Sequence, residues 1–261
     1  MMTNKLQVIS HKKDFAKPYV SALLCGGHKN LYISTMKFEE LEDLIRFANI
    51  SLRDGIKEDY KATINGVVDP RAQRVLRFYH LKYAILNYNA CYDYILQIIY
   101  FAFDFCGEID NTQNYEEQLE KCTFGYTSKF RKLFKEYCAT KPEAKELFDK
   151  LTDLYDIKRK KLSSWANAIK HRGNFTIPEM KPNRTNACIF GEGSIVFSPE
   201  IIYPNTATIE EIIEELKMQN KYICEFAEYL FDFIGFNKTN TNKLNVEDWF
   251  LDVRPFVYER N

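Results

Sequence analysis

Apolar residues recur at helical spacing along much of this chain. After Phe38 the spacing of three and four residues predicts a helix that ends near Gly55. Its apolar positions are Leu41, Leu44, Ile45, Ala48 and Leu52. The stretch "NLYIST" at residues 30–35 precedes it, and its composition predicts a short strand.

The longest predicted helix covers residues 70–106, which contain no Gly or Pro after Pro70 itself. Its second half is apolar on nearly all sides, as expected of a central core helix. Gly107 and the polar loop after it are expected to end the helix. A weaker helical segment follows at about 115–138, interrupted near "CTFGYTS".

Two more long helices are predicted downstream. One begins at Pro142, keeps its apolar residues along one side and ends at Gly173. The other begins at Thr208, which forms a capping-box pattern with Glu211. Between them, residues 187–198 hold two short β-rich runs around a Gly-Glu-Gly turn. We therefore expect a mainly α protein, a bundle of about four long helices with a small β-hairpin insertion.

The central helix carries a polar stripe. Asn89, Asp93 and Gln97 are spaced i, i+4 and i+8. Lys82 and Asp104 extend the stripe by seven residues at either end. Buried polar groups need hydrogen-bond partners, so this stripe is either the solvent face of the helix or one wall of a polar cleft.

A second polar stripe lies on the helix that begins at Pro142. Lys160, Ser164, Asn167 and His171 follow spacings of four, three and four, on the side opposite Leu162 and Trp165. Lys170, His171 and Arg172 stand in the last turn before Gly173, where cations also suit the carbonyl end of a helix. The stripe is therefore either a functional surface or a favourable helix end.

Charge and cysteine content limit the possible functions. Lys plus Arg equals Asp plus Glu at 36 each, so binding of nucleic acid would need a local basic patch, for which "KRKK" at 158–161 is one candidate. The seven cysteines form no CxxC pair, which favours a reducing, cytoplasmic location. The most apolar run, "YILQIIYFAF", is about half the length that crosses a bilayer. The four histidines are far apart, so we expect no metal site. We also expect no cofactor and no membrane span.

The segment "WANAIKHRG" at 165–173 resembles the signature helix of the HEPN superfamily of four-helix domains, and the preceding helix "NACYDYILQIIYFAF" adds to the likeness. The family pattern is an Arg, usually followed by Asn, then three residues and a His. Asn167 and His171 match it, whereas Ala166 replaces the Arg. Lys170, one helical turn later, is the nearest cation expected to stand in for that Arg.

The resemblance implies a domain organisation and an assembly. Residues 1–69 would be a lead-in packed on the bundle, 70–236 a HEPN-like bundle with the hairpin insert at 187–198, and 237–261 an aromatic tail that anchors a partner or folds back. Catalytic members of the family are metal-independent ribonucleases that often work across a dimer of signature helices. The resemblance therefore implies a homodimer through the helix at 142–172.

Three functions are compatible with these patterns. The first is a degenerate, non-catalytic module of a prokaryotic defence or toxin-type system that binds RNA, a nucleotide or a protein partner. The second is a metal-independent endoribonuclease with His171 as acid/base and Lys170 or Arg172 as phosphate electrophile. The third is an unrelated helical interaction module. Catalysis would require Asp93, Asn167 and His171 to converge on one cleft, with substrate contacts from Asn89, Gln97, Lys160 and Ser164.

Overall fold

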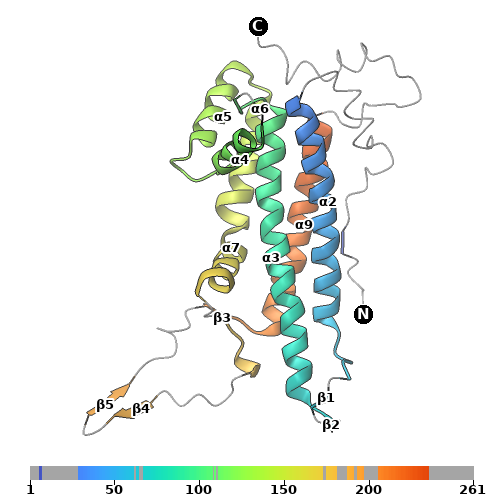
Figure 1. Cartoon of the computed structure of the whole chain (residues 1–261), viewed down its shortest axis with the longest axis vertical. Coiled ribbons are helices and arrows are strands. Elements are labelled where there is room, and N and C mark those ends of the chain that lie inside the picture. Colours follow the sequence, from blue (N-terminus) through green and yellow to red (C-terminus); the bar gives the residue numbers. More distant parts are fainter. Residues whose placement is uncertain are drawn as a thin grey trace. The chain divides into compact units, whose positions relative to one another are not determined.

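The computed structural model describes residues 6–7, 29–61, 63–64, 67–107, 109, 111–172, 175–180, 187–190, 193–196 and 205–234. This part of the chain is mainly helical (Figure 1). Its three long helices are α2 (Lys29–Ile56), α3 (Pro70–Ala102) and α9 (Ile209–Ile234). The shorter α-helices are α4 (Thr112–Lys121), α5 (Lys129–Thr140), α6 (Ala144–Asp153) and α7 (Lys160–Asn167).

The predicted number of about four long helices is therefore wrong: the described residues hold seven α-helices, three of them long. The single helix expected over 142–172 is divided into α6, a π-helix η2 (Leu154–Lys158), α7 and a second π-helix η3 (Ala168–Arg172). A π turn keeps the chain helical but adds a residue to the turn, so it changes which side chains share a face.

The strand expected at 30–35 is also wrong, because these residues belong to α2. Leu31, Ser34 and Thr35 are buried, and they continue the helical spacing of the buried Phe38 and Leu41. Packing of this continuous face outweighs the weak strand preference of the segment.

Short strands occupy the connections between the helices. β1 (Thr63–Ile64) pairs antiparallel with β2 (Val67–Val68), and β3 (Phe175–Thr176) pairs parallel with β6 (Asn205–Thr206). Within the predicted hairpin insertion, β4 (Ala187–Phe190) pairs antiparallel with β5 (Gly193–Val196). Residues 191–192 and 197–198 of that insertion, and the aromatic tail at 237–261, lie outside the described residues.

The chain divides into two compact units, and α2, α3 and α9 each contribute residues to both. The first unit consists of the chain up to Ile45, Ala90–Lys158 and the chain from Lys221. In this unit α4, α5 and α6 lie on one side of the last turns of α3 (Figure 1). Its core is aromatic: the Phe134 ring lies 5.3 Å from Phe148 and 5.9 Å from Phe103, measured between centroids.

The second unit consists of Arg46–Asn89 and Arg159–Asn220. Here the end of α2 lies against the first half of α3 (Figure 1). A Cβ atom at Gly55 would lie 2.6 Å from Leu81 Cδ2, so the two helices approach closely because Gly55 has no side chain. The predicted domain boundaries after 69 and 236 stay predictions.

Candidate functional site

The polar stripe predicted on the 142–172 helix lies on an exposed surface of the second unit. Lys160, Ser164, Asn167, Lys170 and His171 are all exposed, and we refer to these five residues as the α7 face. On the other side of the same segment Leu162, Trp165, Ala166 and Ala168 are buried. The α7 face is thus the polar side of an amphipathic element that packs its apolar side into the second unit.

Ala166, which stands where the family pattern has Arg, is fully buried. Lys170 is exposed and lies in η3, where the helical turn is wider than in an α-helix. The expectation that Lys170 stands in for the missing Arg assumed α-helical spacing, and it stays a prediction.

Arg159 lies on the buried side of the segment as well. It is 7% exposed, and its Nε donates a hydrogen bond of 3.3 Å to Oδ1 of Asn89, which is 3% exposed. Asn89 was predicted to bind substrate on a polar stripe of α3. Its amide oxygen instead pairs with Arg159 inside the second unit, as expected of a polar group on a core helix.

The remaining candidates are divided between the two units. Asp93 and Gln97 belong to the first unit, whereas Asn167 and His171 belong to the second. Both α3 side chains are partly buried, and no described residue makes a hydrogen bond to Oε1 of Gln97. The convergence of Asp93, Asn167 and His171 therefore stays a prediction. The side chain of Arg172 lies outside the described residues.

Three of the four residues in the "KRKK" run at 158–161 pair with other residues of their own unit. Lys158 Nζ lies 2.7 Å from Asp153 Oδ2, and Lys161 Nζ lies 3.4 Å from Glu215 Oε2. With Arg159 buried, Lys160 is the member of the run that contributes to the α7 face. The run is therefore not a continuous cationic patch.

Sequence reasoning missed a polar network in the second unit that connects α2, α3 and α9. Oδ1 of Asn49 accepts hydrogen bonds from the Tyr88 hydroxyl and, at 2.9 Å, from Nδ2 of Asn220. Gln219, which is fully buried, donates to Glu215 over 2.8 Å. Asn and Gln within otherwise apolar helix faces were the available signal. Such a network fixes the helices in one register.

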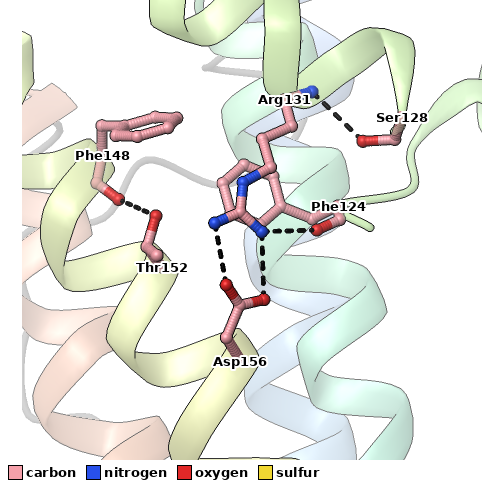
Figure 2. Close-up of polar contacts among 6 residues, drawn as sticks. All are labelled: Phe124, Ser128, Arg131, Phe148, Thr152 and Asp156. Carbon is pink, nitrogen blue, oxygen red and sulfur yellow. Dashed lines mark hydrogen bonds and ion pairs between the residues drawn. The ribbon is translucent and has the colours of Figure 1, made fainter. Parts of the chain in front are cut away.

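A partly buried ion pair in the first unit was also missed (Figure 2). Arg131 of α5 makes a bidentate contact with Asp156 of η2, with N–O distances of 3.1 and 2.8 Å. Its guanidinium also lies 4.9 Å from the Phe124 ring centroid and 4.7 Å from that of Tyr126. Both charged side chains are 14% exposed, and the pair joins α5 to the π-helix.

Thiol and metal chemistry find no support in the described residues. Burial raises the pKa of Cys106, Cys122 and Cys224 to about 12, so these thiols are protonated at neutral pH and are poor nucleophiles. Among the described residues, no group of three or more His, Cys, Asp or Glu side chains is arranged to hold a metal ion. Nor is any described helix both long and apolar enough to cross a membrane.

The chain was compared with protein-family models, with curated proteins and with solved structures, and none of them matches it.

Proposed function

We propose that this protein is a non-catalytic, HEPN-like helical module that binds RNA or a nucleotide through the α7 face. The proposal keeps the resemblance of "WANAIKHRG" to the HEPN signature helix. The observation that carries it is the burial of Ala166 beside an exposed Asn167 and an exposed His171.

Catalysis of RNA cleavage needs a cation held against the reacting phosphate in a site that excludes water. Position 166 supplies no cation, and Arg159 pairs with Asn89 in the interior. Lys170 and His171 are exposed, so water screens their charge. These features favour binding over catalysis.

The α7 face has the chemistry of a phosphate-binding surface. Lys160 and Lys170 carry positive charge, and Ser164 and Asn167 offer hydrogen-bond donors. Lysines and short polar side chains are the usual contacts to phosphate oxygens and sugars in nucleic-acid complexes. A place in a prokaryotic defence or toxin-type system, and a homodimer through 142–172, are parts of the proposal that follow from the resemblance.

Binding of a labelled single-stranded RNA, followed by fluorescence anisotropy over a series of salt concentrations, tests the proposal. We expect saturable binding that weakens as salt rises, because neutralised phosphates release counterions. The negative slope of log K against log salt should be less steep by about 1 in Lys170→Ala, because one phosphate contact is lost. Lys145→Ala is the control, because Lys145 is an exposed lysine of the first unit that pairs with Asp149.

The absence of saturable binding to RNA and to nucleotides would overturn the proposal. An equal salt slope for wild type, Lys170→Ala and Lys145→Ala would remove the α7 face as the site. Cleavage of the RNA by the wild type that is lost in His171→Ala or Arg172→Ala, at unchanged melting temperature, would establish the ribonuclease alternative instead.

A further inference from the structure

The first half of α3 is strongly basic in a chain that has no net charge. Residues 70–92 contain no Asp or Glu. The same stretch holds Arg71, Arg74, Arg77, His80 and Lys82. Since the chain as a whole provides no attractive field for an anion, this local excess of positive charge is the kind of patch that a polyanionic ligand needs.

Exposed aromatic and apolar side chains lie within this basic stretch. Arg71, Val75, Tyr79 and Tyr83 are spaced at i, i+4, i+8 and i+12, so they form one row along α3, which we call the α3 row. Val75 is 49% exposed, Tyr79 53% and Tyr83 46%. The buried Phe78, Leu81 and Ile85 face the core of the second unit, and the α3 row faces away from it.

The two tyrosines of the row are held against each other. Their ring centroids are 4.8 Å apart with the planes inclined at 62°, and the Tyr79 hydroxyl donates to the Tyr83 hydroxyl over 3.3 Å. Tyr79 also contacts the His80 ring edge-on at 5.7 Å. These contacts restrain the rings while much of their surface stays open to solvent, which lowers the entropy cost of stacking a flat ligand on them.

At its amino-terminal end the α3 row leads into a pocket of about 170 Å³. The pocket is lined by Arg71, Arg74, Val75, Glu179 and Met180. Arg74 Nη1 donates to the Glu179 backbone oxygen over 2.8 Å, which holds its guanidinium at the pocket. Arginine in such a place recognises phosphate through its planar fork of N–H groups.

Glu179 is the acidic residue among those that line the pocket, and a backbone N–H at the start of α9 partly compensates its negative charge. Its Oε1 accepts the backbone N–H of Ile209 over 3.1 Å at the start of α9, where a negative charge is favourable. Its Oε2 is buried and has no hydrogen-bond partner among the described residues.

We propose that the α3 row and this pocket form a binding site for a single-stranded nucleic acid. Bases stack on Tyr79 and Tyr83, and Arg71 and Arg74 contact the phosphates. Alternating cations and open aromatic rings characterise sites that bind single strands without reading their sequence. A second copy of this chain is a poor occupant, because a symmetric contact would bring the two basic stretches together. The inference rests on the proposed binding of RNA, and it adds contacts on α3 to those of the α7 face.

The test is binding of labelled single-stranded RNA and DNA of equal length to the full-length protein and to Tyr79→Ala, Tyr83→Ala and Arg71→Ala. We expect each tyrosine variant to raise Kd by about tenfold or more, since one stacked base is lost. Arg71→Ala should reduce the salt slope. Phe47→Ala and Arg53→Ala are the matched controls, because both residues are exposed on α2 in the same unit.

Tighter binding of RNA than of DNA by the wild type would indicate that a 2′-hydroxyl is bound as well, and would support the site if the tyrosine variants weaken both strands. Equal loss of RNA and DNA binding in the tyrosine variants would support stacking alone. Unchanged Kd values in all three α3 variants, with weaker binding in Lys170→Ala, would overturn this inference and leave the α7 face as the site. No binding of either strand by the wild type, or binding only of anionic vesicles, would overturn both.

Discussion

At the scale of single residues, two positions restrict which amino acid can stand there: one has a positive φ, and the other lies where two helices approach closely. Asp104 has a φ of 56° and follows the end of α3 at Ala102. The N–H of Asp104 bonds to the oxygen of Phe101, and that of Phe105 to the oxygen of Tyr100, which is the Schellman pattern. The sequence had suggested Gly107 as the end of this helix. The left-handed residue is an Asp, a substitute for Gly that sequence patterns rarely reveal.

The conformation of Asp104 leads to a first prediction. Asp104→Ala and Asp104→Gly both remove the hydrogen bond that Asn30 donates to this carboxylate. They differ in the cost of a positive φ, which is about 1 kcal/mol or more for Ala and negligible for Gly. Urea unfolding should therefore find Asp104→Gly more stable than Asp104→Ala. Equal stability of the two variants would contradict the left-handed conformation.

Gly55 is the second position that restricts the amino acid, because α2 and α3 approach closely there. Gly55→Ala would place a methyl group 2.6 Å from Leu81 Cδ2, and Leu81 is fully buried. The free energy of unfolding should fall by about 1–3 kcal/mol, the usual cost of overpacking. Gly125→Ala is the control, because no atom lies within 4 Å of the added Cβ, and its stability should stay close to that of the wild type. A neutral Gly55→Ala would mean that α2 and α3 do not approach closely at this point.

At the scale of elements, the sequence predicted the long helices with a continuous apolar face well, and the π turns that interrupt a helix poorly. Residues 70–106 and the helix from Thr208 were recognised because apolar spacing extends over many turns. The Thr208 capping box is present, with Glu211 N–H bonding to the Thr208 hydroxyl over 3.1 Å. The π turns η2 and η3 were not foreseen, and η2 also contacts a residue far apart in the chain. Asp156 of η2 pairs with Arg131.

The contact between α5 and η2 provides a prediction for these elements. Asp156→Ala leaves the Arg131 guanidinium partly buried without its bidentate partner, so the free energy of unfolding should fall by about 2 kcal/mol or more. The double variant Arg131→Met/Asp156→Leu should recover much of this loss, since no unpaired charge remains. Thermal unfolding of the wild type and the two variants measures both effects. A double variant no more stable than Asp156→Ala would contradict this account of the pair.

At the scale of the whole molecule, the helical spacing of apolar residues predicted the helical class, while the division into two compact units could not be foreseen. The units exchange residues within α2, α3 and α9, and no break in composition marks the boundaries. The exposed α7 face followed from periodicity alone. The burial of Arg159 with Asn89 did not, because a long cationic side chain normally stays in water.

The buried thiols predict how the molecule responds to pH. In the folded protein the pKa of Cys106, Cys122 and Cys224 is raised to about 12 by burial, from an ordinary value of 9.0. The folded state therefore holds these protons more tightly than the unfolded state, and its stability is complete below pH 9 and falls as pH rises toward 12. Urea unfolding at neutral pH and at pH values between these limits should show the decrease. Stability that stays constant over this range would contradict the burial of the thiols.

We propose that this protein binds RNA and leaves it intact. One measurement tests it most directly: the wild-type protein is incubated with an end-labelled single-stranded RNA, and each sample is divided between an anisotropy reading and a denaturing gel. We expect saturable, salt-sensitive binding and full-length RNA at every protein concentration. Cleavage products that accumulate with protein and disappear in His171→Ala, or a flat anisotropy signal, would contradict it.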